Sequence, residues 1–483
     1  FFNWGSFSNI DNNGIGYANG STGRTPTWTS QNYITYDHKF NEKHHVNLLL
    51  GAEWSSSYSQ SLGASSSGYS TDFYQYNNLG AGSLPSSVSS RYSAFQTNSY
   101  FGRLNYYYSD KYLVTLTSRY DGSSVFGANN KYALFPSAAL GWVASKENFF
   151  INNQSLSKIF SFFKIRGSYG LTGNSPAAYS SLATVGSYTV NLNNQIIKGS
   201  GIGGAPNPDL RWEKTKQLDI GADIRMFDDR ISLTVDGYSK KTTDLLFSVP
   251  VSVVSGYTSV TSNIGSVQNR GIELNLDATI IRKKDLGWDV SVLYAKNNNK
   301  VLALGTTNAD VISSGFLGSS TILRVGKPMG SFIGMKRLGT WGTSEAAEAA
   351  LYGKKPGDIK RLDVNHDFKF DENDMQFLGS PFPKYDMTFS TSFRYKNWDL
   401  NVDIQLRQGG KVENVAALTI EDRTWFASGY ASVLKDAWTP THQNTMVPAL
   451  RMAADPWNTD FGSYADSHWF EDGSFVRGRS LNL

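Results

Sequence analysis

The most regular alternation of apolar and polar residues in the chain runs from Tyr385 to Arg407. It predicts two strands joined by a two-residue turn at Lys396-Asn397. In the second strand, five apolar residues share one face: Trp398, Leu400, Val402, Ile404 and Leu406. Five polar residues share the other face: Asp399, Asn401, Asp403, Gln405 and Arg407. Because successive side chains of a strand point to opposite faces, this hairpin has one apolar and one polar surface.

Each arm of the hairpin is about ten residues long, which is the length of a tilted strand that crosses a bilayer. A half-buried strand of a soluble sandwich alternates in the same way. One hairpin therefore fits both interpretations, and the rest of the chain has to separate them.

Period-two segments recur from one end of the chain to the other. We predict strands at 31–40, 44–56, 98–108, 111–121, 132–144, 161–170, 213–226, 230–242, 267–281, 286–297, 385–396, 398–408 and from about 475 onward. No stretch of linker composition divides this series, so residues 1–483 are predicted to form one domain.

The predicted connections fall into two classes. Several are very short: 41–43, 109–110, 227–229 and 396–397. The others are long and rich in Ser, Gly and Asn: 57–97, 171–212, 243–266, 298–384 and 409–474. This alternation is typical of outer-membrane barrels, whose short turns are periplasmic and whose long loops are extracellular. A soluble sandwich has no reason to sort its loops by length.

Composition narrows the choice further. The chain has no cysteine, 45 basic and 41 acidic residues, and a net charge of +4. Disulfides and thiolate metal sites are thus excluded, and the charge favours neither a nucleic-acid partner nor a polybasic membrane patch. No apolar run approaches the roughly eighteen residues of a membrane helix, which excludes helical spans but not a barrel. The first residues lack the features of a signal peptide, so a mature form or a fragment is expected.

These patterns predict an all-β fold, namely a transmembrane antiparallel β-barrel. The polar faces would then line the lumen, where five charged residues suit a hydrated path: Glu273, Asp277, Asp399, Asp403 and Arg407. The last predicted strand stops at the end of the chain. Since an open sheet edge is not tolerated in lipid, we expect either further strands or a longer protein.

Short segments along the chain form an ordered series. They are Tyr100–Tyr106 with Asp110–Leu113, Arg119–Ser124, Phe135–Trp142, Lys164–Gly170 with Thr172–Asn174, Asn207–Lys214, Asn269–Glu273, Gly357–Ile359 with Asp363, and Pro381–Tyr385. In this order they resemble the motifs of SusC/RagA-type TonB-dependent outer-membrane transporters. The series extends over nearly the whole chain.

The resemblance implies a 22-stranded barrel with an N-terminal plug and a TonB-interaction segment, in the outer membrane of a Gram-negative bacterium. It also implies energised import of large nutrients, oligosaccharides or peptides, with a SusD-like surface lipoprotein as a lid. Nothing in the chain resembles the plug or the TonB segment, and the final strands are missing. We therefore interpret residues 1–483 as the barrel portion of a longer protein.

Two other functions fit a barrel. A passive porin needs no plug, so the upstream sequence would discriminate it from a transporter. An outer-membrane barrel hydrolase needs a Ser-His-acid set, which is spatial and cannot be excluded by spacing. The chain has no G-x-S-x-G segment, and none of its six histidines has H-E-x-x-H spacing. The sequence therefore predicts no enzyme.

One acidic cluster has the spacing of a calcium loop. Oxygen ligands stand at positions 1, 3, 5, 9 and 12, with a backbone carbonyl at position 7: Asp363, Asn365, Asp367, Asp371, Asp374 and the carbonyl of Lys369. Phe368 replaces the usual glycine at position 6, and Asp374 replaces the bidentate glutamate at position 12. The alternative is a charged surface turn. We predict a structural Ca²⁺ here.

The position of this loop follows from strand parity. The connections at 282–285 and 396–397 are both short, so strand 286–297 runs outward and strand 385–396 runs inward. The segment between them, including Asp363 to Asp374, is therefore predicted to be extracellular. Loops 57–97 and 409–474 are predicted to lie on the same side and to form most of the lipoprotein contact.

Two local predictions complete the picture. Ser344 is expected to cap a short helix from Glu345 to Tyr352, which Gly353 ends. Five aromatic residues of the long loops are candidate platforms for a glycan, with loop packing as the alternative: Tyr69, Tyr74, Trp425, Trp457 and Trp469.

Overall fold

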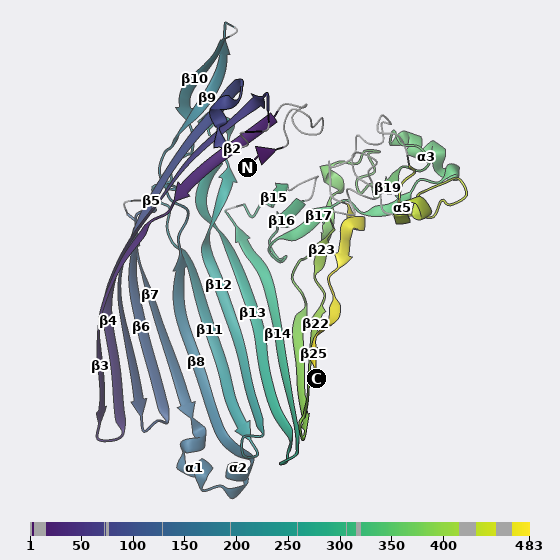
Figure 1. The fold of residues 1–483 in the computed structure, drawn as a ribbon. Helices are drawn as coiled ribbons and strands as arrows, with labels where there is room; N and C mark the ends of the chain where they lie inside the picture. Colours follow the sequence, from purple (N-terminus) through teal and green to yellow (C-terminus); the bar gives the residue numbers. More distant parts are fainter. Residues whose placement is uncertain are drawn as a thin grey trace.

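The computed structural model describes residues 2–3, 16–71, 73, 77–127, 129–193, 195–257, 259–305, 307–314, 320–414, 431–450 and 466–483. One large antiparallel sheet dominates this part of the chain, and a group of smaller elements lies at one end of it (Figure 1). None of the described helices has the length and apolar character needed to cross a membrane.

Fifteen strands of the described chain form the large sheet. They are β1 (Phe2–Asn3), β2 (Gly16–Arg24), β3 (Thr27–Phe40), β4 (His44–Tyr69), β5 (Leu84–Tyr108), β6 (Tyr112–Ser123), β7 (Tyr132–Val143), β8 (Phe160–Asn174), β11 (Glu213–Met226), β12 (Ile231–Pro250), β13 (Ser259–Arg282), β14 (Leu286–Leu304), β21 (Tyr385–Tyr395), β22 (Trp398–Gln408) and β25 (Phe475–Asn482). Each strand pairs with the next in this order, except that β2 pairs with β4 and β3 also pairs with β4. Every strand predicted from the alternation is present, which confirms the barrel-type fold.

Strand β2 was not predicted, and Pro26 explains why it is separate from β3. Arg24 lies opposite Gln60 of β4, and Thr27 lies opposite Ser57, so β2 and β3 run along the same partner strand. Proline has no N–H to donate to the ladder, so pairing is interrupted at this point. Because β2 is rich in Gly, Ser and Asn, it lacks the apolar alternation that marks the other strands.

Three of the predicted long loops are shorter than expected. Strands β4 and β5 stay paired as far as Ser67 and Leu84, so most of 57–97 is a hairpin. Strands β12 and β13 leave only 251–258 between them, and 171–212 contains a second hairpin of β9 (Val185–Leu192) and β10 (Gln195–Ile202). These segments extend beyond the apolar part of the sheet. There the apolar and polar residues are no longer sorted onto opposite faces, while the ladder hydrogen bonds persist.

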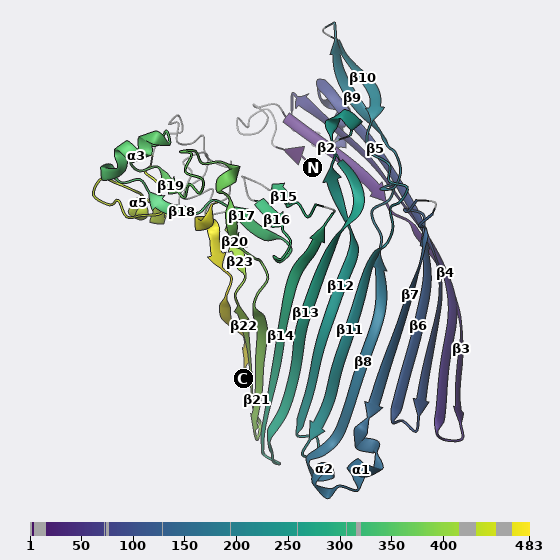
Figure 2. The same cartoon turned by 180° about the vertical axis from the view of Figure 1, so that it is seen from behind.

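The two ends of the sheet differ in the length of their connections (Figures 1 and 2). At the lower end of Figure 1, tight turns contain non-glycine residues with positive φ, including Ser109, Asp110 and Lys396. Such residues are typical of the hairpin turns that match strand twist. The connection 144–159 is the exception, with the short helices α1 (Asn148–Ile151) and α2 (Gln154–Ile159). The longest connections, 305–384 and 409–474, leave from the upper end, as parity predicted.

The two faces of the sheet differ in polarity across its whole width. In the β21–β22 hairpin, Ile404 lies opposite Phe389, and on the other face Asp403 lies opposite Ser390. The predicted segregation of the two faces is therefore present. Apolar side chains on the first face are widely exposed, for example Ile34 at 78% and Leu140 at 62%. An uncovered apolar face suits contact with lipid. We call it the outward face and the polar one the inner face.

The smaller elements form what we call the outer cap, the described residues within 307–384 and 409–474. It contains β15 (Val311–Ser314), β16 (Ser320–Leu323), β17 (Ser331–Gly334), β18 (Arg337–Thr340), β19 (Ile359–Arg361), β20 (Gln376–Gly379), β23 (Lys411–Glu413) and β24 (Phe470–Asp472), with helices α3 (Ala346–Leu351) and α5 (Ala431–Asp436). Its strands form sheets of four and two strands apart from the large sheet (Figure 2).

Helix α3 departs from the prediction at its start. Ser344 lies within a 3-10 turn, 343–345, and makes no capping hydrogen bond to α3. The Glu345 carboxylate instead accepts a hydrogen bond from the Gly342 amide at 2.8 Å. The predicted end is correct, because Gly353 follows with φ +66°.

Candidate functional site

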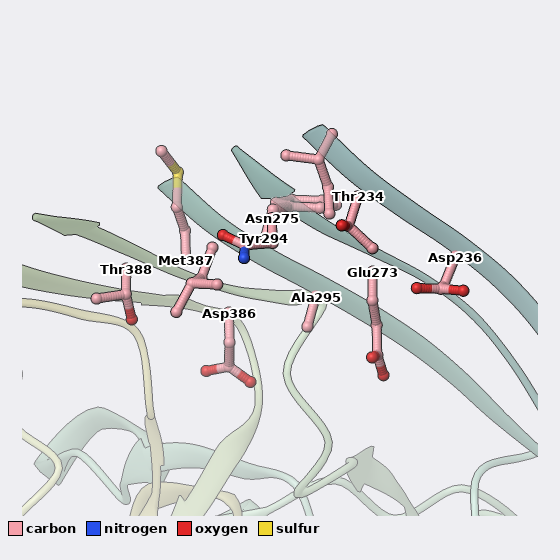
Figure 3. Close-up of a pocket in the computed structure, with 11 residues that line it drawn as sticks. Thr234, Asp236, Glu273, Asn275, Tyr294, Ala295, Asp386, Met387 and Thr388 are labelled. Carbon is pink, nitrogen blue, oxygen red and sulfur yellow. The ribbon is translucent and has the colours of Figure 1, made fainter. Parts of the chain in front are cut away.

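The inner face carries a hollow between β12 and β21 that is lined by three acidic residues. Asp236, Glu273 and Asp386 come from β12, β13 and β21, and their carboxylates lie on the same side of the sheet (Figure 3). Asp236 and Glu273 lie directly opposite each other in the ladder. Met387 points to the other face, as the alternation requires. This arrangement presents hydrogen-bond acceptors toward the interior.

Beside this hollow, Arg166 of β8 connects two acidic residues on the next two strands. Its guanidinium lies 2.7 Å from the Asp236 carboxylate and 3.3 Å from that of Asp223. Lys164 adds a contact of 3.6 Å to Asp223. These side chains are about one-third exposed or less, so water screens the pairs and each contributes little to stability. Their main consequence is a group of fixed charges across three strands, with the cations on β8 and the carboxylates on β11 and β12.

Two further hollows continue the inner face, one nearer the tight turns of β12 to β22 and the other on β6 to β11. One is lined by Asp277, Asp289 and Asp403 together with several serines of β14 and β21. The other is lined by Arg119, Asp121 and Asp219. The inner face is therefore polar from β6 to β22, and paired charges alternate with hydroxyl and amide groups. Such a surface can hydrogen bond a large polar solute at many points.

The five charged residues predicted to line the lumen do share this face. Glu273 and Asp277 lie on β13, and Asp403 and Arg407 lie on β22. The Arg407 guanidinium is 2.7 Å from Asp386, and Asp399 lies opposite Arg394 in the ladder. The sequence analysis missed the Arg166 group, although its members occupy polar positions of predicted strands.

The predicted calcium loop lies in the outer cap, at the end opposite the tight turns. Asp363 and Asp374 are buried and close together, since the Asp374 carboxylate accepts from the Val364 amide at 2.7 Å. The Asp363 carboxylate accepts from the amides of His366 at 2.7 Å and Phe368 at 3.0 Å. Burial acts to raise the pKa of Asp363, but these amides outweigh it and lower the pKa below its usual value.

The other members of the loop lie on its exposed side. Asn365 donates to Asp367 at 3.1 Å, and Asp371 accepts from the Asn373 amide at 2.8 Å. Within the described residues, no three acidic or histidine side chains are grouped as a metal-ligand set, and Lys369 enters the loop's contacts through its amide. Phe368 adopts φ +61°, so the backbone makes the turn expected of glycine at this position. Calcium binding stays a prediction.

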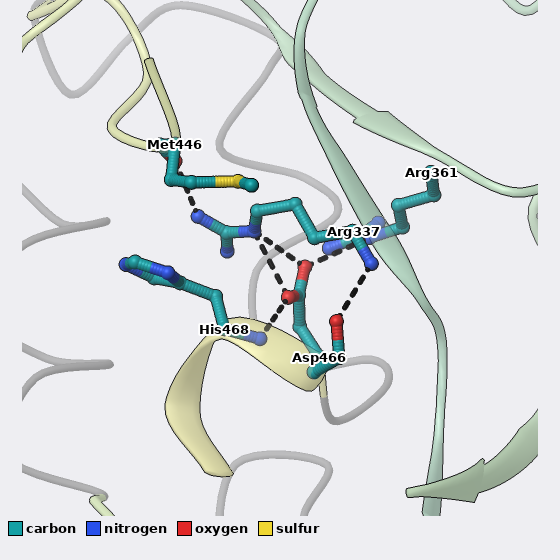
Figure 4. A network of polar contacts seen from close by, with 6 residues as sticks. Arg337, Arg361, Met446, Asp466 and His468 are labelled. Atoms are coloured by element: carbon teal, nitrogen blue, oxygen red, sulfur yellow. Dashed lines mark hydrogen bonds and ion pairs between the residues drawn. The ribbon is translucent and has the colours of Figure 1, made fainter. Parts of the chain in front are cut away.

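A buried ion-pair network holds the outer cap together (Figure 4). Asp466 is fully buried, and both of its oxygens lie 2.9 Å from Nε of Arg337, with Arg361 at 3.4 Å. Burial acts to raise the pKa of Asp466, but the two guanidinium groups outweigh it and lower the pKa. Arg337 also donates to the Met446 carbonyl at 2.8 Å. The network thus joins β18, β19 and two segments more than 100 residues later in the chain.

Two of the candidate aromatic platforms are packing residues instead. Tyr69 is 4% exposed and donates to the Leu79 carbonyl, and Trp469 is 2% exposed beside Arg337. A buried ring has no free face for a sugar. Tyr74, Trp425 and Trp457 lie outside the described residues.

Comparison with known proteins agrees with this architecture. The family model "TonB dependent receptor-like, beta-barrel" matches residues 1–405. The chain is 34% identical over 470 residues to TonB-dependent receptor P3 of Formosa agariphila. The aligned residues cover 95% of this chain and 45% of that protein. It is 31% identical over 397 residues to TonB-dependent receptor SusC of Bacteroides thetaiotaomicron, covering 80% and 37% respectively.

A solved structure resembles the chain over almost its entire length. The structure of the RagAB peptide transporter is 26% identical, with a TM-score of 0.78, and the match covers 99% of this chain and 51% of the other. The chain thus spans less than half the length of the two curated relatives named above. It belongs to the TonB-dependent receptor-like β-barrel family.

Proposed function

We propose that this chain forms part of the barrel wall of an outer-membrane transporter, which imports large polar nutrients with energy supplied through TonB. The single observation that carries the proposal is the segregation of faces over the whole sheet. A wide apolar face is uncovered, and a polar face with paired charges lines hollows on the other side. The cargo class is an oligosaccharide or a peptide. SusC and RagAB, the latter described as a peptide transporter, are among the similar proteins.

TonB dependence separates this function from a passive porin. The full-length protein should support uptake of labelled oligosaccharides or peptides in its native host, and deletion of TonB should abolish that uptake. A porin would conduct the same solutes without TonB. Uptake that persists unchanged in the deletion strain would contradict the proposal. Production of altered cargo by purified full-length protein would instead favour the hydrolase alternative.

The Arg166 group offers a direct test of the inner face. Replacing Arg166 with Gln removes the cation that contacts Asp236 and one of the two cations that contact Asp223, on the path of the solute. We expect the KM for uptake to change by several-fold while the amount of folded protein in the membrane stays constant. Lys43→Gln, in the tight turn between β3 and β4, is the matched control. Equal uptake by both variants would argue against a role for this group.

We further propose that a SusD-like lipoprotein docks at the outer end. The β9–β10 hairpin projects from this end, and its apolar side chains are exposed, with Val190 at 53% and Ile196 at 77%. A solvent-exposed apolar hairpin on a polar rim suits a protein contact. Tagged full-length protein should co-purify with a lid lipoprotein, and deletion of 186–201 should weaken that association. If substitutions at the tight turns alone abolished the co-purification, the lipoprotein would have to dock at the opposite end of the sheet. That result would contradict the proposal.

Calcium at the Asp363–Asp374 loop is a separate proposal. The carboxylates of Asp363 and Asp374 and the exposed oxygens around them supply the hard ligands that Ca²⁺ prefers. We expect Ca²⁺ to protect the full-length protein from proteolysis within 363–374, and Asp363→Asn with Asp374→Asn to abolish the protection. Mg²⁺, which demands stricter octahedral geometry, is the control. Identical cleavage with Ca²⁺ and with a chelator would show that the backbone contacts alone hold the loop.

A further inference from the structure

A cluster of basic residues lies on the outward face, away from the inner hollows. We call it the basic border. It comprises Lys214 and Lys216 of β11, Lys241 of β12, Arg270 of β13, and Lys296 and Lys300 of β14. In each strand these residues have the same parity as exposed apolar ones, such as Ile220 on β11 and Ile272 on β13. They therefore share the face assigned to lipid.

The strand register brings these residues together. Lys216 lies directly opposite Lys241. Arg270 lies opposite Asn298, between Lys296 and Lys300 on the neighbouring strand. Directly opposite residues have Cβ atoms about 5 Å apart, and diagonal neighbours about 7–8 Å apart. The four strands together span about 14 Å at the usual strand spacing.

The basic border sits at one edge of the apolar band. On β13 the next outward-facing residues after Arg270 are Ile272, Leu274 and Leu276, and the band continues to Ile280 near the tight turn. On β14 Tyr294 and Val292 follow Lys296 in the same direction. The cations therefore lie at the outer limit of the band, where lipid headgroups meet the tails.

On other strands, the outer limit of the apolar band carries a different kind of side chain. On β4 to β7 it carries aromatic side chains: Trp54, Tyr100, Tyr120 and Tyr132. Tyr120 and Tyr132 stack with ring centroids 5.1 Å apart, and Tyr100 lies opposite Tyr120 in the ladder. These strands have the girdle expected of a membrane barrel. The basic residues on β11 to β14 are thus a local feature rather than a general property of this border.

In the part of the chain that the structure describes, no acidic side chain is in ion-pair contact with the basic border. Arg270 has the side-chain oxygen of Gln268 as its nearby acceptor. All except Lys214 are exposed. Like charges directly opposite in a sheet destabilise it, so Lys216 and Lys241 repel each other until an anion lies between them.

We propose that the basic border binds the phosphate groups of a lipid headgroup in the outer leaflet. The inference rests on the membrane placement given under the proposed function. The position selects the ligand, because an anion here must have an apolar tail that lies along Ile272 and Ile220. A soluble acidic partner would gain nothing from the adjoining apolar band. Lysine and arginine are the residues that bind phosphate, as a point charge and as a planar fork respectively.

The test uses full-length protein in detergent micelles with diphosphorylated lipid A as the probe, and binding is followed by native mass spectrometry. The variant Lys216→Gln/Lys241→Gln/Lys296→Gln should bind about 100-fold more weakly, since each basic residue near an anionic surface changes affinity by roughly five-fold. The control Lys43→Gln/Lys283→Gln/Lys284→Gln removes three exposed lysines at the opposite border and should bind normally. High salt should narrow the difference between the variants.

Removing the phosphates separates headgroup binding from binding of the tails. Lipid A without phosphates should bind the unaltered protein as weakly as the phosphorylated lipid binds the triple variant. Inorganic phosphate alone should not compete, because it lacks the tail. Equal binding of both lipids, or equal loss in the control variant, would overturn the proposal, as would competition by inorganic phosphate at concentrations similar to those of the lipid. TonB-dependent uptake is a separate readout, so its failure would leave this result interpretable.

Discussion

The large sheet and the outer cap use charge in opposite ways. In the sheet, the Arg166–Asp236 pair lies on the inner face with its side chains 34% and 23% exposed. In the outer cap, the Arg337–Asp466 pair has no exposed surface on either side chain. A screened pair contributes little to stability, whereas a buried charge is costly as soon as its partner is removed. The same residue types therefore line a hydrated surface in one region and fix the fold in the other.

The difference reflects what each region can bury. A sheet that faces lipid obtains its order from ladder hydrogen bonds and from the surrounding apolar phase. The outer cap has short strands and helices, so it needs contacts between segments distant in sequence. Asp466 supplies one such contact, because Arg337 and Arg361 reach it from β18 and β19. Disruption of the network should therefore affect the cap and leave the sheet intact.

The largest effect is expected from Asp466→Asn. This change keeps the shape of the side chain but removes the buried negative charge that Arg337 and Arg361 contact. Removing one partner of a buried ion pair costs about 3–5 kcal/mol. We expect hydrogen exchange to accelerate in β18, β19 and helix α5, with the strands of the sheet unchanged.

Glu348→Gln is the matched control for this experiment, since Glu348 is an exposed acid on helix α3 of the same cap. The double variant Arg337→Met/Asp466→Asn should cost less than the sum of the two single variants, because the removed groups interact. Equal acceleration across the large sheet would show that the cap and the sheet unfold together. That result would contradict the view that the buried network stabilises the cap and leaves the sheet intact.

The second prediction concerns the sheet. Ile404→Lys places a charge on the outward face of β22, opposite Phe389. If the side chain lies near the midplane, folding into a bilayer should become less favourable by about 2–4 kcal/mol. Gln405→Lys, one residue away on the inner face, should cost much less. Urea titration of full-length protein in lipid vesicles measures both. Similar losses for the two variants would contradict the assignment of faces.

The sequence predicted the sheet well for a physical reason. Alternation survives wherever one face meets lipid and the other meets water, as in β22 and β13. It is absent where Ser, Gly and other small residues occupy both faces, so β2 and the outer parts of β4 and β5 were missed. The net charge, likewise, does not show how the charged residues are distributed over the fold. A total of +4 argued against a basic membrane patch, yet the register of four strands brings six basic residues together.

The contacts within the outer cap could not be predicted from the sequence. Arg337 and Asp466 are separated by 129 residues, and neither stands in a recognisable motif. Only the folded chain shows that they meet. For the Asp363–Asp374 loop, the sequence revealed the spacing of the oxygen-bearing residues but not their contacts. The direction of each carboxylate toward a backbone amide depends on local turns.

A third prediction follows from the lowered pKa of Asp466. A carboxyl whose pKa is lower in the folded state than in the unfolded state stabilises the fold above the unfolded value, which is about 3.9. That contribution is lost as the pH falls through the folded value. Proteolysis of the cap should therefore be constant from neutral pH to about pH 5 and accelerate below about pH 4.

The pH effect should be smaller than that of the substitution, because a carboxylate near its pKa is only partly protonated. Asp466→Asn should abolish most of the acceleration below pH 4, since it removes the titrating group. Opening of the cap that begins near pH 6 to 7 would contradict the assignment of the pH effect to Asp466.

The smallest effect is expected at Phe368, where local strain and a ring contact oppose each other. Its φ of +61° lies in the left-handed region, which costs a non-glycine residue about 1–2 kcal/mol. Its half-exposed ring contacts Tyr352 with the centroids 5.5 Å apart, which returns about 0.5–1.5 kcal/mol. Phe368→Gly should therefore change the stability of the cap by less than about 1 kcal/mol.

His366→Gly separates the two contributions, because His366 has φ +60° and an exposed side chain. We expect it to stabilise the cap more than Phe368→Gly does, as measured by the hydrogen exchange of β19. A loss of stability in both variants would mean that the loop gains more from its side chains than it loses in backbone strain.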